Sequence, residues 1–229
     1  MARLKRVSIV GVAEHVIQRG NNRQVCFASE EDSNAYLTWL KKYAKEYEVE
    51  VHAWVLMTNH IHLLCTPLQE HAVSRMMQAL GRMYVRYFNH TYKRTGTLWE
   101  GRFKSSLVQS DEHLLEVYRY IELNPVRAGM VEGPSEYLWS SYHCNSLGKV
   151  NDLLTPHSIY LALGGGGSER CYNYTLLFKQ SMSSDLLDEI RKHVNSGLAL
   201  GNQHFTDEVE RLTKQRVTEG VRGRPRVDV

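Results

Sequence analysis

Four short stretches in the first half of the chain have the apolar content and the bounding turn residues of β-strands. Thr58 and Asn59 interrupt the apolar run between the second and third stretches. Pro67 ends the third stretch, because proline cannot donate a hydrogen bond to a sheet. We predict strands at residues 15–19, 49–56, 60–66 and 105–108.

Elsewhere, apolar residues recur three and four positions apart, which is the spacing of one face of a helix. Tyr36, Leu40 and Tyr43 are an example from the first such stretch. Pro125 stops the third one, because the residue before a proline disfavours helical backbone. We predict helices at residues 33–48, 74–89, 111–124, 184–195 and 206–217.

Strands and helices alternate, and one pair of strands is close in sequence, which favours an α+β sandwich with a mostly antiparallel sheet. We expect a core of residues 1–145, a linker region of residues 146–183 and a small helical C-terminal extension of residues 184–229. Four consecutive glycines at residues 164–167 predict a flexible joint within the linker region. The last two helices are compatible with a helix-turn-helix or with an ordinary helical appendage.

Composition excludes several classes of protein. Of the 229 residues, 42% are hydrophobic and 23% are charged, which is ordinary for a globular protein and excludes disorder of the whole chain. No apolar run is long enough to span a membrane, and no apolar segment of a signal peptide follows the basic N-terminus. The four cysteines lie far apart, which argues against a zinc ribbon or a disulfide framework and indicates reduced cytoplasmic thiols.

Positive charge is concentrated in one segment, although the formal net charge is only +3. The segment from Arg75 to Lys104 contains seven Lys and Arg residues and a single acidic residue, Glu100. Several aromatic residues are interspersed among them. Such a mixture suits single-stranded nucleic acid, because rings stack on bases while cations contact phosphates. The alternative is an amphipathic helix whose rings are core. The predicted DNA-binding residues of this segment and the N-terminal one are Arg19, Arg23, Arg82, Arg86, Lys93, Arg94, Trp99, Arg102 and Lys104.

The C-terminal tail adds two further candidates, Arg222 and Arg224, in the sequence Arg-Gly-Arg-Pro. This sequence is the core of a motif that places arginine in the minor groove of A·T-rich DNA. A solvated basic tail is the alternative.

His60 and His62 are separated by one residue within a predicted strand. Since side chains alternate along a strand, both imidazoles share one face while Ile61 points to the other. Two imidazoles on a rigid strand form a bidentate platform for a metal ion. A single pair of this kind also occurs by chance, so a structural pair of histidines is the alternative.

The predicted helix before Pro125 carries two tyrosines in different settings. Tyr118 falls on the apolar stripe and is expected in the core, whereas Tyr120 lies off it, one turn before Asn124. If this helix crosses the face of His60 and His62, the Asn124 oxygen completes a site for Mg²⁺ or Mn²⁺. Tyr120 would then attack a phosphate and form a covalent phosphotyrosine. The alternative is a surface tyrosine and an asparagine that ends the helix.

Four segments resemble the single-tyrosine HUH transposases, and in particular their REP-associated tyrosine transposase branch, which is related to small insertion-sequence transposases. The segments are EHVIQRGNNR at residues 14–23, LMTNHIHL at 56–63, GTLWEGRFK at 96–104 and YIELNPVRAG at 120–129. Their shared order over residues 1–145 makes the match specific.

The resemblance implies a ferredoxin-like core and metal-dependent cleavage and rejoining of single-stranded DNA through a 5′-phosphotyrosine. The implied partners are hairpins formed by repetitive extragenic palindromes, which suggests a cytoplasmic, nucleoid-associated protein. Carried onto this sequence, His60 and His62 are the HUH pair, Tyr120 is the nucleophile and Asn124 is the third metal ligand. Relatives are monomers or homodimers, and both remain open here.

Two other functions compete with this one. The first is a domesticated, non-catalytic protein that binds DNA hairpins, which the complete set of candidate residues disfavours. The second is a metal phosphodiesterase that uses water as its nucleophile, with the histidine pair at its centre.

Overall fold

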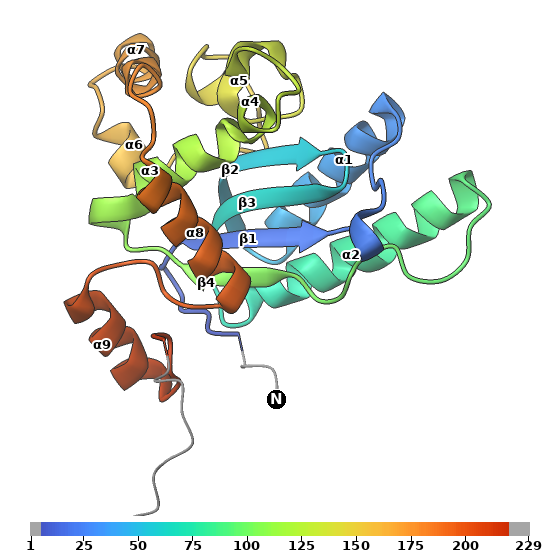
Figure 1. Ribbon diagram of the computed structural model, residues 1–229, viewed down its shortest axis with the longest axis horizontal. Helices are drawn as coiled ribbons and strands as arrows, with labels where there is room; N and C mark the ends of the chain where they lie inside the picture. The colour runs from blue at the N-terminus through green and yellow to red at the C-terminus, as the bar shows by residue number, and fades with distance from the viewer. Residues whose placement is uncertain (1–5, 220–229) are drawn as a thin grey trace, which may run out of the picture.

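The computed structural model describes residues 6–219, and four of its strands form one antiparallel sheet (Figure 1). Their spatial order is β2-β3-β1-β4, with β1 and β4 hydrogen-bonded as the edge pair and β2 at the other edge. This order, with one helix between β1 and β2 and another between β3 and β4, is the ferredoxin-like arrangement, and it confirms the predicted fold class. The strands are β1 (Glu14–Arg19), β2 (Val49–Met57), β3 (His60–Pro67) and β4 (Lys104–Leu107).

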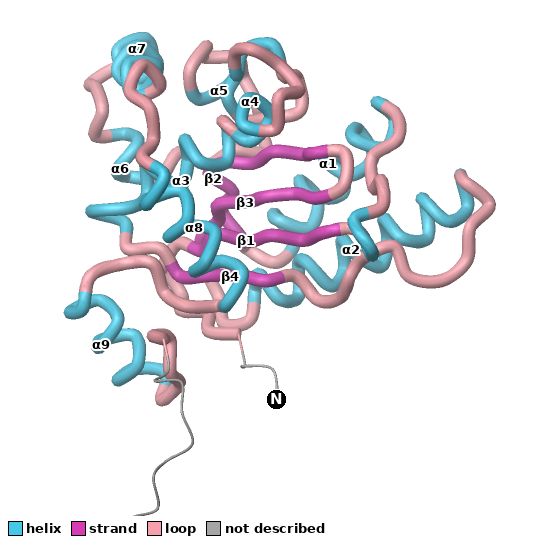
Figure 2. The backbone as a smooth tube through the Cα atoms, viewed as in Figure 1, coloured by secondary structure: helices cyan, strands magenta, loops and turns pink. Residues whose placement is uncertain are grey.

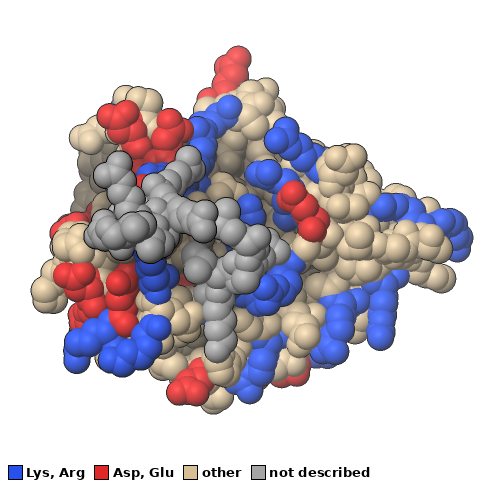
Figure 3. Space-filling view, turned by 60° about the horizontal axis from the view of Figure 1, so that its bottom comes forward, with Lys and Arg blue, Asp and Glu red and all other residues tan. Residues whose placement is uncertain are grey.

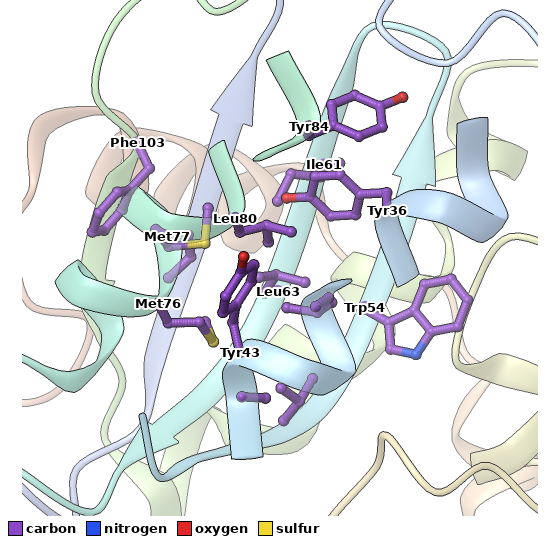
Figure 4. Close-up of a cluster of buried hydrophobic side chains, with 14 of the residues drawn as sticks. Tyr36, Tyr43, Trp54, Ile61, Leu63, Met76, Met77, Leu80, Tyr84 and Phe103 are labelled. Atoms are coloured by element: carbon purple, nitrogen blue, oxygen red, sulfur yellow. The ribbon is translucent and has the colours of Figure 1, made fainter. Parts of the chain in front are cut away.

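One face of the sheet is covered by the two long helices α1 (Glu30–Glu46) and α2 (Ala72–Thr91). Figure 4 shows the core between them, where Tyr36 and Tyr84 pack against the aliphatic residues of β3. Ser29 fixes the start of α1, because its hydroxyl accepts from the Asp32 backbone while the Asp32 carboxylate accepts from the Ser29 backbone. Both helices occur where the apolar spacing predicts them.

The opposite face of the sheet is covered by α3 (Ser110–Glu122), which lies over β2 and β3, and by α8 (Ser184–Ser196), which lies over β1 and β4 (Figure 1). Leu114, Tyr118 and Ile190 belong to one apolar cluster that joins these two helices. Figure 2 shows the resulting order of layers, with the sheet between the α1 and α2 pair and the α3 and α8 pair. One helix of the C-terminal extension therefore packs directly on the sheet.

Residues 142–177 form short helices beside α3. The glycines at residues 164–167 connect two of them, and the Gly165 backbone donates a hydrogen bond to Glu169 Oε2 at 2.8 Å. Tyr160 and Tyr174 pack against Tyr118 in the α3 cluster. The helices are α5 (Tyr142–Asn145), α6 (Ser158–Leu161) and α7 (Gly167–Leu177).

The C-terminal helices do not support a helix-turn-helix. Helix α9 (Gln203–Thr213) packs through Val209 against Val7 and Leu107, whereas α8 packs through Ile190 into the α3 cluster. The two helices thus occupy different cores, while a helix-turn-helix requires them to pack on each other. The predicted contacts of Arg222 and Arg224 lie outside the described residues.

The helix that carries Tyr120 is shorter than predicted. It ends at Glu122, and a new short helix, α4 (Asn124–Arg127), begins at Asn124 with Pro125 in its first turn. Proline is accepted there because its missing N–H would have no partner in the first turn of a helix. Two 3₁₀ turns complete the described elements, η1 (Asn21–Arg23) and η2 (Pro134–Glu136). Within residues 6–219, no helix is long and apolar enough to cross a membrane.

Candidate active site and nucleic-acid interface

Strand β3 presents His60 and His62 on the face of the sheet that α3 and α8 cover. Their ring centroids are 5.2 Å apart. Strand β1 lies alongside, with Arg19 paired to His60 and Ile17 paired to His62 in the antiparallel register. The alternation of side chains along both strands therefore places His15, Ile17 and Arg19 on the same face as the two histidines.

The tautomer of His60 is defined by its neighbour Asn59. The Asn59 amide Nδ2 donates to the Arg23 carbonyl at 3.2 Å, which orients the amide and leaves its oxygen as an acceptor. That oxygen lies 2.7 Å from His60 Nδ1, so Nδ1 carries the proton. The Nε2 of His60 therefore keeps its lone pair and is available to a metal ion.

His62 is hydrogen-bonded through Nδ1 to His15 Nε2 at 2.8 Å, and the two rings stack with centroids 5.0 Å apart. His15 lies on β1 two residues from the position directly opposite His62, which makes the pair diagonal neighbours across the strands. His60 and His62 thus both have Nδ1 engaged by another side chain, which is the usual arrangement for a histidine that binds a metal through Nε2.

Burial keeps the three imidazoles neutral. His15 and His62 are almost completely buried, and His60 is half-buried. Burial, reinforced by the charge of Arg127, lowers the pKa of His15 to about 3, and burial with the charge of Arg19 lowers the pKa of His60 to about 4. Burial also lowers the pKa of His62 well below its usual value. Neutral imidazole is the form that binds metals.

Helix α3 brings Tyr120 to this group. The Tyr120 ring meets the His62 ring edge-on at a centroid distance of 5.7 Å and the His15 ring at 5.6 Å. Tyr118, two residues earlier, is buried on the other side of the helix against Tyr160. The structure therefore brings the predicted nucleophile to the predicted histidine pair.

Asn124 and Arg127, on α4, both bind the backbone of Tyr120. The Asn124 amide Nδ2 donates to the Tyr120 carbonyl at 3.1 Å, which leaves Oδ1 as the atom available for other contacts. Arg127 Nη2 donates to the same carbonyl at 2.6 Å, and its guanidinium carbon lies 4.3 Å from the centre of the Tyr120 ring. Two side chains of α4 thus hold the C-terminal end of α3, and with it Tyr120, in place.

These residues fit a divalent cation in their donor chemistry. Two imidazole Nε2 atoms and one amide oxygen supply mixed nitrogen and oxygen ligands with room for substrate, as Mn²⁺ or Mg²⁺ requires. Within the described part of the chain, no three His, Cys, Asp or Glu residues are grouped so that they could hold a metal ion.

Most of the predicted DNA-binding residues line one of two hollows near the edge strand β4, a groove and a smaller cavity. Arg82, Arg86 and Arg102 line a groove of about 670 Å³ between α2 and the β4 edge, and Arg6 and Arg75 line it too. Met77, Val85 and Phe103 form its apolar floor, so the groove combines cations with hydrophobic surface. Figure 3 shows Lys and Arg gathered on the side of the molecule that carries α2 and the loop after it.

A second, smaller cavity of about 190 Å³ lies on the site face. Arg19, Arg102 and Lys104 line it, and α8 closes one side with Asn195. Lys104 Nζ donates to Asn195 Oδ1 at 3.0 Å. One cation of this cavity lies beside the histidine pair, because Arg19 on β1 is paired with His60.

Three of the predicted contacts, Arg23, Lys93 and Arg94, line neither the groove nor the smaller cavity, and a fourth, Trp99, requires a correction. Arg23 is exposed in η1, while Lys93 and Arg94 follow the end of α2, where Arg94 binds Gln24 and lies over the Phe88 ring. Trp99 is only 6% exposed, because its ring stacks on Tyr84 in the core. Its ring therefore supports the groove wall and cannot stack on a base as predicted.

Sequence reasoning missed His15 and Arg127 as members of the site. Both lie within segments that carry the family resemblance, at 14–23 and 120–129. The signal available in the sequence for His15 is its position on a predicted strand, where alternation puts it on the same face as His60 and His62 once the register of β1 and β3 is known.

Comparisons with known proteins find similarity in both sequence and fold. The sequence model of the IS200-like transposases matches residues 8–124. A protein of Haemophilus influenzae, provisionally named a REP-associated tyrosine transposase, is 28% identical over 121 residues, which cover 48% of this chain and 68% of that protein. A solved structure described as a REP-associated tyrosine transposase bound to a REP hairpin aligns with a TM-score of 0.53 and 19% identity, over 69% of this chain and 93% of the other. At that identity the likeness shows the fold alone.

Proposed function

Because this chain belongs to the IS200-like transposase family, we propose that it cleaves and rejoins single-stranded DNA at hairpin-forming repeats through a covalent bond to Tyr120. The observation that carries the proposal is the contact of the Tyr120 ring with His62 on one face of the sheet. A nucleophile, a histidine pair and a set of arginines converge there from four different elements, β1, β3, α3 and α4.

His60, His62 and Asn124 would hold a divalent cation, Mg²⁺ or Mn²⁺. When bound, such a cation polarises the scissile phosphate and neutralises the charge that develops on its oxygens. Asn59 and His15 keep the two imidazoles in place through their Nδ1 atoms. The amide of Asn124 is held by the Tyr120 carbonyl, which links the third ligand to the nucleophile's own backbone.

The covalent step forms one bond and breaks one. Tyr120 Oη attacks the phosphorus, the bond from phosphorus to the 3′ oxygen breaks, and the phenolic proton is lost while the departing oxygen gains one. The products are a 5′-phosphotyrosine and a free 3′ hydroxyl. Since the number of phosphodiester-type bonds is conserved, attack by a 3′ hydroxyl on the phosphotyrosine rejoins a strand without ATP.

The basic groove beside β4 is the proposed contact for the paired stem of the hairpin. Its arginines come from α2, from the loop before β4 and from the segment before β1, so cations from three parts of the chain line one groove. Arginine and lysine contacts to phosphates supply affinity without reading sequence. The related solved structure is described as bound to a REP hairpin, which supports a hairpin as the partner.

Two alternatives remain distinct from this proposal. A domesticated relative would bind the hairpin and leave it intact, whereas a water-using phosphodiesterase would cleave DNA without a covalent adduct. The packing of Tyr120 against the histidine face favours the covalent route, because neither alternative needs a phenol there.

The test is incubation of labelled single-stranded hairpin DNA with the protein and Mn²⁺ or Mg²⁺, followed by denaturing electrophoresis. We expect a covalent protein–DNA adduct with wild type, and no adduct after chelation of the metal or in Tyr120→Phe. Cleaved DNA without an adduct would favour the water mechanism, and retarded but intact DNA would favour the binding protein.

A further inference from the structure

His15 is a buried histidine at the centre of the site that neither binds the proposed metal ion nor takes part in the proposed covalent step. It is fully buried on β1, and its Nε2 lies 2.8 Å from Nδ1 of His62. Its other nitrogen, Nδ1, is buried without a hydrogen-bond partner. An unpaired buried polar atom lowers stability, so an apolar residue would be the simpler choice for a purely structural position.

The hydrogen bond between His15 and His62 allows two arrangements of protons. In the first, His15 donates from Nε2, and His62 then carries its own proton on Nε2, where it blocks coordination. In the second, His62 donates from Nδ1 to a lone pair on His15 Nε2, and the Nε2 of His62 is free. Only the second arrangement is compatible with His62 as a metal ligand.

We propose that His15 is a positioning residue that accepts the Nδ1 proton of His62 and thereby holds the His62 Nε2 lone pair toward the metal. This role rests on the proposed metal-dependent function. It makes His15 the counterpart of Asn59, whose oxygen does the same for His60 at 2.7 Å. Each member of the histidine pair thus has its own acceptor, and the two acceptors come from different segments of the chain.

The packing around His15 supports a role in orientation. The His15 ring is stacked on His62 with an angle of 28° between the planes, and it meets Tyr120 edge-on. It therefore touches the ligand and the nucleophile at once. Without the His15 ring, the His62 ring would be free to rotate about χ2, and His62 would be free to adopt either tautomer.

The experiment measures Mn²⁺ binding to the free protein by the loss of the free-ion electron paramagnetic resonance signal. We expect His15→Leu to weaken Mn²⁺ binding about 10–100-fold, as substitutions of residues that hydrogen-bond to a metal ligand typically do. His15→Gln, whose amide oxygen can accept the same proton, should recover most of that loss. His52→Gln is the matched control, because His52 is buried on β2 and bonded to Thr155 and Thr66, and it should bind Mn²⁺ like wild type.

A second readout reports the proton itself. In protein labelled with ¹⁵N-histidine and saturated with Mg²⁺, long-range ¹⁵N–¹H spectra should show His62 protonated on Nδ1. A proton on Nε2 of His62 in that state, or Mn²⁺ binding by His15→Leu within twofold of wild type, would overturn the proposal.

The same measurements distinguish failure of the site from failure of this role. Absence of Mn²⁺ binding in wild type, or full binding by His60→Ala with His62→Ala, would overturn the proposed metal site and the role of His15 with it. Normal wild-type binding that is lost in the double variant and kept in His15→Leu would overturn the role of His15 alone.

Discussion

Tyr118 and Tyr120 are two residues apart on α3, yet their side chains point to opposite sides of that helix. Tyr120 lies against His62 with a centroid distance of 5.7 Å, whereas Tyr118 stacks on Tyr160 at 6.1 Å with nearly parallel planes. Two residues correspond to about 200° around a helix, which explains the separation. Only one of these phenols faces the histidine pair.

The two tyrosines therefore make a matched pair of variants. Tyr120→Phe should abolish the covalent adduct with hairpin DNA, because the attacking oxygen is gone. Tyr118→Phe should leave the adduct yield near that of wild type, because the ring that packs against Tyr160 is kept. Loss of the adduct in Tyr118→Phe with retention in Tyr120→Phe would reverse the assignment.

The basic groove predicts a steep dependence of hairpin binding on salt. Arg82 and Arg86 are exposed on α2, one turn apart, and both line the groove. If each contacts a phosphate, changing both to Gln should reduce the slope of log affinity against log salt by about 1–2. Binding isotherms at several salt concentrations measure this slope.

Arg211→Gln is the control for that measurement, since Arg211 is exposed on α9, away from the groove. It should leave the slope unchanged. An unaltered slope in the Arg82 and Arg86 double variant would show that the groove does not follow phosphates.

Glu122 predicts a dependence of stability on pH. It is fully buried at the end of α3, and its carboxylate accepts hydrogen bonds from Ser141, Asn145 and Tyr174 at 2.5–2.8 Å. Burial outweighs these bonds and raises the pKa of Glu122 to about 7. The folded protein thus binds a proton that the unfolded chain releases near pH 4.5, so this group costs stability as the pH rises from about 4.5 through 7.

Glu122→Gln should remove that contribution. Relative to wild type, the variant's free energy of unfolding should rise between pH 5.5 and pH 8 by up to about 2 kcal/mol. Burial also raises the pKa of Glu14 to about 7, but that group is the same in both proteins and cancels from the difference. Urea denaturation at the two pH values measures the effect, and a difference that does not change with pH would contradict the raised pKa.

Gly20 is required for close packing at the end of β1. A Cβ at this position would overlap the Gln24 carbonyl oxygen and lie 2.5 Å from Cys26 Sγ. We expect Gly20→Ala to lower the free energy of unfolding by about 1–3 kcal/mol, because backbone must move to make room. Gly167→Ala is the control: its nearest neighbour would be 4.0 Å away, and alanine favours the helix that begins there. Equal unfolding midpoints for both variants would refute this account.

The sequence by itself determined the four strands, the helices α1, α2, α3, α8 and α9, and the candidate chemistry, but not the helices α4 to α7. Strand alternation placed His60 and His62 on one face, and helical periodicity separated Tyr118 from Tyr120, because both depend only on the local repeat of the backbone. Four motifs in one order identified the family. Pro125 marked the end of the tyrosine helix to within two residues of its observed end at Glu122.

Other features depend on contacts between residues far apart in the chain. The pairing of β1 with β3 brings His15 to His62 across a separation of 47 positions in the chain, and the sequence between them carries no local signal for that contact. Helix α8 packs on β1 and β4, which is the part of this sheet face that α3 does not cover. Which part is left uncovered is decided only when the layers assemble.

The burial of Trp99 is a further feature that the sequence alone did not predict. A tryptophan beside arginines looks like a stacking platform, and only the packed structure shows that its ring lies against Tyr84. Local repeats decide which side of a strand or helix a residue occupies. The three-dimensional packing of those elements decides which faces meet, and so it decided which histidine supports the site and which rings remain in the core.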